Sequence, residues 1–380
     1  MLFFIFLINS NIQNKSEQKN AYIRKEEIHH DVMDIKKELW AVKDGRDIHR
    51  YTITNASGAS VVLGEIGAAI VEINVPDKEG KLADVVIGYP EAESYFGDGP
   101  CSGKIPGRYA NRICKGHLDI DGKTYQLPIN NGPNHLHGGP EGFQNKIWES
   151  RIEGNAVEFM YFSEDGEMGY PGNMKVLARY EWTEENQLIL TLSAESDADT
   201  VVNLTNHAYF NLNGEGNGDI LEHELQLSCA EYLPTDDTLI PLGESEAVAG
   251  TPMDFVTPKA LGKDIHQDFP ALNYGKGYDA CWVIDGYTPG QLADAAFLYS
   301  PASGRTLKVT TTQPGIQIYT GNWLAGCPEG KKGHIYEDYY GVALECQHFP
   351  DSPNKDYYPS TLLKTGELFH EAIIFAFGTK

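Results

Sequence analysis

The sequence lacks the patterns typical of a disulfide-stabilised scaffold or a nucleic-acid-binding protein. Its six cysteines are scattered over 380 residues without a CxxC pair, so free buried thiols are the expected state. Basic residues are scarce: 30 Lys and Arg stand against 54 Asp and Glu, the formal net charge is −24, and no basic run is present. This charge repels phosphate backbones and anionic lipids, so we expect neither nucleic acid nor a membrane as a partner.

Long hydrophobic runs are also missing. The apolar run Leu2–Ile8 has seven residues, whereas a membrane-spanning helix needs about 20. No Lys or Arg precedes this run and no clear cleavage site follows it, so we expect a cytoplasmic protein, with export through this segment as the alternative. Residues 1–43 contain no Gly or Pro and many Lys, Glu, Gln and Asn. We expect them to form a leader or extension outside the catalytic domain, either disordered or acting as a signal segment.

From Gly45 onward, frequent Gly and Pro separate short runs of β-branched and aromatic residues, which is the texture of a β protein. No Pro/Ser/Gly-rich linker divides the chain, so residues 44–380 are expected to form one all-β domain of packed antiparallel sheets with few short helices. The strand-like runs are residues 60–66, 69–75, 156–163, 188–193, 201–205, 306–312, 316–320, 342–349 and 372–377. The turn signal Gln313-Pro314-Gly315 lies between two of these runs and predicts a hairpin with Gln313 at a strand end.

Polar side chains gather in two Gly-rich segments, residues 105–113 and 134–139. Arg112 offers a planar fork of donors suited to paired hydroxyls, and Asn111 offers a donor and an acceptor. A structural ion pair is the alternative role for Arg112. His135 and His137 would point to the same side of an extended segment, a spacing that metal ligands also use. Because no nearby Glu or Cys completes a ligand set, we prefer sugar binding to a metal site.

Two further segments carry candidate acid–base groups. His207 is surrounded by Asn, Thr and Tyr, which could orient it and tune it toward neutral pH, although a lone His is usually structural or exposed. A strand over residues 342–349 would place Glu345 and Gln347 on the face opposite Leu344 and Cys346. A mid-strand carboxylate is costly unless it is functional or paired, for instance with Arg112, and burial would raise its pKa toward that of a useful base.

Eight motifs in order closely resemble the aldose 1-epimerase (galactose mutarotase) family over residues 45–380. They are GRYANRI, NHLHGG, NLTNHAYFNL, YLPTDDTLIP, GTPMDF, GYD, TTQPGIQIYTGN and LECQHFPDSPN. The resemblance implies a large antiparallel β-sandwich of the supersandwich type with an open sugar cleft. It also implies Glu345 as general base and His207 as general acid, with the sugar bound or oriented by Asn111, Arg112, His137, Asp279 and Gln313. The N-terminal extension and Cys346 within LECQ are the departures from the family pattern.

The activity implied by the resemblance is the interconversion of α and β anomers of free hexoses such as galactose and glucose. This isomerase reaction of hexose metabolism opens and closes the sugar ring by acid–base catalysis and requires no cofactor. A bound Ca²⁺ would be compatible, but no ligand cluster argues for one. The expected partner is a monosaccharide, and the expected assembly is a monomer or a weak dimer.

Two other functions compete with this one. Glu345 and Asp279, itself suited to a turn or a cap, could form the carboxylate pair of a glycoside hydrolase. A noncatalytic carbohydrate-binding protein on the same fold is the second alternative. It would not require a His and a Glu at the acid and base positions, and this chain has both.

Overall fold

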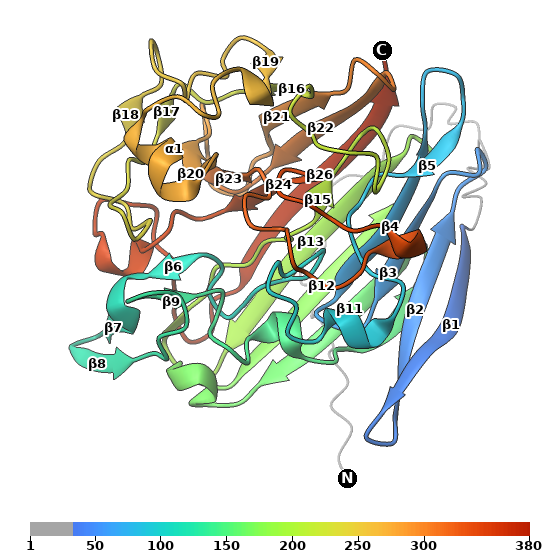
Figure 1. Ribbon diagram of the computed structural model, residues 1–380. Coiled ribbons are helices and arrows are strands. Elements are labelled where there is room, and N and C mark those ends of the chain that lie inside the picture. Colours follow the sequence, from blue (N-terminus) through green and yellow to red (C-terminus); the bar gives the residue numbers. More distant parts are fainter. Residues whose placement is uncertain (1–32) are drawn as a thin grey trace, which may run out of the picture. The chain divides into compact units, whose positions relative to one another are not determined.

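Antiparallel strands dominate the computed structural model, which describes residues 33–380 (Figure 1). Within these residues the one α-helix is α1 (Pro270–Gly275), and the other helical turns are short 3₁₀ segments. No helix in the described part of the chain is long and apolar enough to cross a membrane. The prediction of an all-β fold with few short helices is confirmed.

The largest sheet has nine strands in the order β10-β11-β12-β13-β26-β22-β21-β16-β19. Their bounds are β10 (Glu149–Glu153), β11 (Ala156–Ser163), β12 (Met174–Trp182), β13 (Gln187–Ser196), β26 (Phe369–Thr379), β22 (Arg305–Thr311), β21 (Ala293–Tyr299), β16 (Glu224–Leu227) and β19 (Lys259–Ala260). In β12 and β13 every second side chain is buried. This alternation is typical of an antiparallel sheet with one face against the core.

The second sheet has six strands in the order β15-β24-β23-β20-β17-β18. Their bounds are β15 (Tyr209–Phe210), β24 (Val342–Gln347), β23 (Gly315–Tyr319), β20 (Asp279–Val283), β17 (Glu231–Tyr232) and β18 (Glu246–Ala247). Every residue of β24 is buried, and Leu344 and Cys346 belong to the main hydrophobic core. Glu345 lies on the other face of the strand, as the alternation predicted.

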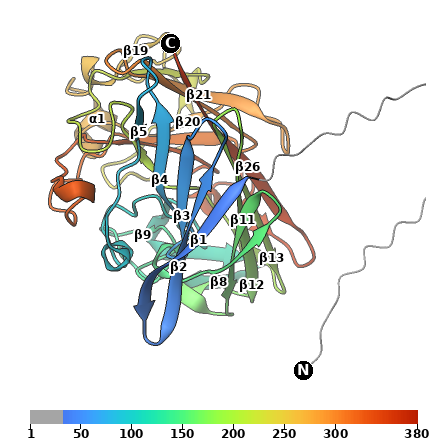
Figure 2. The same cartoon turned by 90° about the vertical axis from the view of Figure 1, so that its right-hand side faces the viewer.

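A third sheet of five strands faces the viewer in Figure 2. It consists of β1 (Asp34–Lys43), β2 (Arg46–Thr54), β3 (Ser60–Gly64), β4 (Ala69–Pro76) and β5 (Leu82–Asp84). A bridge between Val86 and Phe210 links the chain after β5 to edge strand β15 of the six-stranded sheet. One hydrophobic cluster contains residues of all three sheets. The nine-stranded sheet therefore packs with the other two around one core, as a sandwich.

Strand β1 corrects the predicted start of the domain at residue 44. Asp34–Lys43 pairs with β2 along its length, and the ring of Trp40 packs edge-on against Tyr95 with centroids 5.2 Å apart. Gly64 leaves room for this ring, because a Cβ there would lie 2.5 Å from it. The strand is charged and half exposed, as edge strands often are, and so resembles an extension in sequence. The prediction for residues 1–32 falls outside the described residues.

The predicted hairpin at Gln313-Pro314-Gly315 is wrong. Strand β22 pairs with β21 and β26 in the nine-stranded sheet, while β23 pairs with β20 and β24 in the six-stranded sheet. The turn therefore carries the chain from one sheet to the other. The Gln313 side chain anchors the crossing: Nε2 donates to the Leu204 carbonyl at 3.0 Å, and Oε1 is bonded to Nδ1 of His348 at 2.7 Å. Alternation identifies strands, but it does not identify their partners.

The predicted strand over residues 201–205 is also shorter than expected, because β14 ends at Val201. The backbone of Asn203 instead bonds to Arg108 and Ala110, and the side chain of Asn203 bonds to the backbone of His348. Its Oδ1 accepts from the His348 N–H at 2.9 Å, and its Nδ2 donates to the His348 carbonyl at 3.2 Å. Three two-stranded ribbons complete the fold: β14 (Thr200–Val201) with β25 (Leu362–Leu363), β6 (Arg112–Ile113) with β9 (His135–Leu136), and β7 (His117–Ile120) with β8 (Lys123–Gln126).

If β1 is part of the folded domain, Trp40→Ala should lower the free energy of unfolding in urea by about 2 kcal/mol, less than for a fully buried Trp because this ring is half exposed. Leu39→Ala on the same strand is the matched control, since 59% of Leu39 is exposed, and we expect little change from it. Equal effects of the two substitutions would contradict the assignment.

Candidate active site

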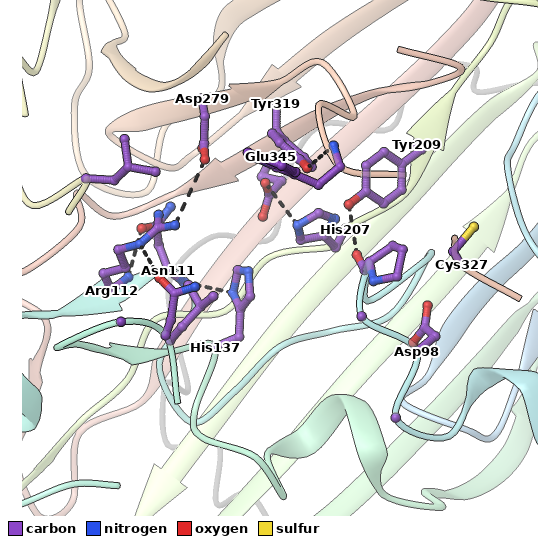
Figure 3. A pocket seen from close by; sticks show the side chains of 18 of the residues that line it. Asp98, Asn111, Arg112, His137, His207, Tyr209, Asp279, Tyr319, Cys327 and Glu345 are labelled. Atoms are coloured by element: carbon purple, nitrogen blue, oxygen red, sulfur yellow. Dashed lines mark hydrogen bonds and ion pairs between the residues drawn. The ribbon is translucent and has the colours of Figure 1, made fainter. Parts of the chain in front are cut away.

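A cleft of about 1000 Å³ opens beside the six-stranded sheet (Figure 3). Loops at residues 93–100, 131–133, 237–239 and 325–328 contribute to its walls. Six of the seven predicted site residues line it: Asn111, Arg112, His137, His207, Asp279 and Glu345. The structure thus brings together side chains that are up to 234 positions apart, from Asn111 to Glu345. Gln313 does not line the cleft, because its side chain holds the crossing between the sheets.

The backbone around Asn111 and His137 fixes one wall of the cleft. The pairing of β6 with β9 brings these residues together, and both have left-handed backbone angles, with φ of 63° and 51°. The N–H of His137 donates to the Asn111 carbonyl at 3.0 Å, and the Asn111 N–H donates to Nδ1 of His137 at 3.1 Å. Because Nδ1 is an acceptor, the neutral ring carries its proton on Nε2. His137 can therefore donate a hydrogen bond through Nε2.

The expectation that His135 and His137 point to the same side is wrong. The left-handed backbone at His137 ends the extended segment, so the alternation rule no longer applies there. The ring of His135 is buried away from the cleft, with Nε2 bonded to the Tyr170 hydroxyl at 2.6 Å and Nδ1 to the Pro128 carbonyl at 2.7 Å. His135 is a structural residue.

Glu345 and His207 face each other inside the cleft, with Nε2 of His207 3.4 Å from Oε1 of Glu345 (Figure 3). Only 2% of Glu345 and 4% of His207 is exposed. Burial raises the pKa of Glu345 well above its ordinary value; the negative charge of Asp279 adds to this, and Arg112 opposes it. Burial lowers the pKa of His207 to about 4. Both shifts favour the uncharged forms of the side chains, which are a carboxylic acid at Glu345 and a neutral imidazole at His207.

Asp279 is held by two neighbours at the cleft wall. Gln317 Nε2 donates to its Oδ1 at 2.6 Å, and Arg112 Nη2 lies 4.0 Å from its Oδ2. Burial raises the pKa of Asp279, while Arg112 and the Gln317 hydrogen bond lower it. The alternative in which Arg112 pairs structurally with Glu345 is not what the structure shows, because the partner of Arg112 is Asp279.

Sequence reasoning missed Gln317, which lies four residues beyond Gln313 in the same motif. It is directly opposite Glu345 in the β23–β24 pairing. Gln317 stands between Ile316 and Ile318 in an apolar run, and a polar residue there is the same signal that identified Glu345.

The aromatic walls were missed as well. The Tyr209 ring lies 5.0 Å from the His207 ring and that of Tyr319 lies 6.3 Å from it. The Tyr209 hydroxyl donates to the Pro100 carbonyl at 2.9 Å, and the Tyr319 hydroxyl accepts from the Trp323 N–H at 3.1 Å. These contacts hold both rings beside His207. In sequence, such aromatic residues cannot be told from core residues.

Ligand atoms of His137, His207 and Glu345 lie within 4.8 Å of one another, as a metal site would require. The hydrogen bond to His137 argues against this use. Its Nδ1 already accepts from the Asn111 N–H, so the neutral ring presents an N–H group and no lone pair at Nε2. These three residues fit a hydroxylated ligand, which needs donors and acceptors, better than a cation.

A family model described as aldose 1-epimerase matches residues 49–376. The chain belongs to the aldose 1-epimerase family. It is 43% identical to galactose mutarotase from Homo sapiens over 311 residues, 82% of this chain and 89% of that protein. It is 35% identical to aldose 1-epimerase from Escherichia coli (strain K12) over 337 residues, 88% of this chain and 96% of that one.

Solved structures agree with this assignment. A crystal structure of an aldose epimerase homologue from C. elegans has a TM-score of 0.79 at 33% identity and covers 86% of this chain and 98% of its own. Galactose 1-epimerase from Lactobacillus acidophilus also has a TM-score of 0.79, at 28% identity, and covers 91% and 99%. This aldose 1-epimerase family member is an isomerase that interconverts hexose anomers, and the implied mutarotase-like sandwich is confirmed.

Opposite charges beside Glu345 should move the pH profile of this epimerase in opposite directions. Arg112→Gln removes a cation that favours loss of protons, so the bell-shaped profile of kcat should move to higher pH by about one unit. Asp279→Asn removes an anion and should move it to lower pH. Both variants should also raise KM, since both residues line the cleft. Polarimetric rates measured across pH would contradict this arrangement if both profiles moved the same way.

Proposed function

We propose that the cleft catalyses anomer exchange of free galactose and glucose, with Glu345 as general base and His207 as general acid. The observation that carries the proposal is the 3.4 Å approach of His207 Nε2 to Glu345 Oε1 within a polar cleft. An acid and a base must reach two oxygens bonded to the same sugar carbon, C1, and two groups this close can do so. The galactose mutarotase relatives at 42–43% identity support galactose as a substrate.

In the reactive state Glu345 is ionised and His207 is protonated. Glu345 takes the proton of the C1 hydroxyl while His207 gives its proton to the ring oxygen, so the bond between C1 and the ring oxygen breaks and an aldehyde forms. Rotation about the C1–C2 bond presents the other carbonyl face, and the two transfers then run in reverse. Ring opening leaves both side chains uncharged. Because burial favours the uncharged forms of both residues, the site stabilises the open-chain state.

The chemistry needs no redox step, so we propose that no cofactor takes part and that Ca²⁺ has no role in it. Each positioned proton-transfer group contributes on the order of 10²–10⁴-fold, and holding the sugar between the two adds a proximity effect. Asn111, Arg112, His137 and Asp279 supply the donors and acceptors for the remaining hydroxyls. Gln317 supports this set through its hydrogen bond to Asp279.

The two competing functions have less support. Asp279 is held by Gln317 and Arg112, and the group that approaches Glu345 is an imidazole, whereas a hydrolase of the common type uses two carboxylates. A noncatalytic sugar-binding protein has no need for a buried Glu–His contact, which costs desolvation of both groups.

We also propose a cytoplasmic location and a monomer or weak dimer as the assembly. All six cysteines lie in the described residues and are unpaired, which fits a reducing compartment.

Glu345→Gln should lower kcat by about 10²–10⁴-fold, because the amide keeps the shape of the side chain but cannot take a proton. Galactose binding, measured by titration calorimetry, should change little. The matched control is Glu246→Gln, an exposed Glu in β18 of the same sheet, which should keep the parent rate. Polarimetry of freshly dissolved α-galactose measures turnover, and activity above a tenth of the parent in Glu345→Gln would contradict the assigned role.

The charge of the cleft predicts discrimination against anionic sugars. Glu93, Asp98, Asp237, Asp279 and Glu345 line it, whereas Arg112 is the cation among the lining residues. Lys43 and Lys104 pair with Glu93 and Asp98 from outside the lining, so Asp237 and Asp279 are the main acidic groups facing the ligand. We expect kcat/KM for galactose 6-phosphate to be at least roughly tenfold below that for galactose, since like charges repel in a low-dielectric cleft. The neutral 6-deoxy sugar controls for loss of the 6-hydroxyl. Equal kcat/KM values for the phosphate and galactose would refute this reasoning.

A further inference from the structure

Several buried polar atoms behind Glu345 have no hydrogen-bond partner among the described residues. They are Oε2 of Glu345, Oε1 of Gln317, and both amide atoms of Gln347. Gln347 is fully buried and does not line the cleft. Buried polar atoms in native proteins are nearly always paired, with ordered water where the protein offers no partner. Four such atoms on three neighbouring residues therefore need a common explanation.

These three side chains share one face of the six-stranded sheet. Gln317 is directly opposite Glu345 in the β23–β24 pairing, and Gln347 follows Glu345 by two residues on β24. The position opposite Gln347 is Gly315, which has no side chain to bond it. A Cβ at Gly315 would lie 2.8 Å from the Phe349 ring and 3.0 Å from Sγ of Cys281. The space beside Gln347 at Gly315 is thus filled by the Phe349 ring and the Cys281 thiol, and the Gln347 amide has no hydrogen-bond partner there.

The segment from Asn203 to His207 runs along the other side of β24. Its two ends are fixed, by the bonds between Asn203 and His348 and by the approach of His207 to Glu345. Thr205 lies between these two contacts, as Gln347 lies between Glu345 and His348. Thr205 is fully buried, and its hydroxyl has no partner among the residues described. Thr205 therefore joins Gln317, Glu345 and Gln347 in one set of buried side chains with unpartnered polar atoms, and we call the space among these four side chains the rear pocket.

We propose that Gln347 is a positioning residue for Glu345 and acts through ordered water held in the rear pocket. The rear pocket offers a carboxylate oxygen, an amide oxygen, a complete amide group and a hydroxyl, which meets the two to four partners that a buried water requires. Oε1 of Glu345 faces His207, so Oε2 is the atom that the water reaches. A donor at Oε2 fixes the carboxylate plane and stabilises its ionised, reactive form.

This inference rests on the proposed role of Glu345 as base. Gln347→Met keeps the length of the side chain and removes its donor and acceptor. Loss of a donor to the carboxylate makes the ionised form less stable, so the Glu345–His207 pair holds its protons more tightly. The bell-shaped kcat profile should move to higher pH by about one unit, the size expected for one hydrogen bond to a charged group. KM for galactose should change less than about twofold, because Gln347 does not touch the cleft.

Gln313→Met is the matched control. Gln313 is a fully buried Gln near the same sheet, but its amide bonds to Leu204 and His348. It should lower the melting temperature without moving the pH profile. Thr205→Val, which keeps the shape of Thr205, should shift the profile in the same direction as Gln347→Met by a smaller amount, and it decides the matter if Gln347→Met does not fold.

The proposal is overturned if the folded variant, Gln347→Met or in its place Thr205→Val, keeps the parent profile within about 0.2 pH units, whatever its kcat. It is also overturned if Gln313→Met shifts the profile equally, since the effect would then follow from general loss of packing. Glu345→Gln, measured beside them, separates the two levels of inference. If that variant stays active, the base assignment itself fails, whereas an inactive Glu345→Gln with an unshifted Gln347→Met removes only the role of Gln347.

Discussion

The burial of one carboxylate in the middle of β24 is the constraint on which the site depends. Glu345 is 2% exposed, and an unpaired charge at such a depth would be strongly disfavoured. The surroundings reduce this cost with an imidazole at 3.4 Å and the positive charge of Arg112, while Asp279 increases it. A pair that shares one proton resolves the conflict, because it can be uncharged. The mechanism proposed above moves this pair between its charged and uncharged forms.

The features predicted well from the sequence are those set by local alternation. The two-residue period of β24 placed Glu345 opposite Leu344 and Cys346, and most of the predicted runs contain strands. Alternation reports which side chains share a face, but strand pairing depends on distant segments. For this reason the turn at Gln313 was interpreted as a hairpin, although β22 and β23 lie in different sheets.

The site was predicted through residues that are unusual for their context, and the failures follow from the same rule. A Glu in an apolar run is conspicuous in the sequence, but a left-handed backbone angle at a His leaves no such signal. The different directions of the His135 and His137 side chains could therefore not be predicted. Gln313 and Gln317 stand in one motif, and only the structure shows that the first holds a crossing and the second contacts Asp279. Strand β1 was not recognised as part of the domain, because it is half exposed and carries the polar residues common in edge strands.

The crossing at Gln313 also bears on how the chain assembles. Strands β10 to β13 pair with their neighbours in sequence. The other partner of β13 is β26, which lies almost two hundred positions later in the chain. Contacts of such separation form slowly, because a long loop must close before any contact forms. Glu345 and His207 are themselves 138 positions apart in the sequence, so their contact also depends on long-range pairing. The Glu345–His207 contact therefore requires that distant segments of the chain have paired, and its formation in a refolding chain would report that this long-range pairing is in place.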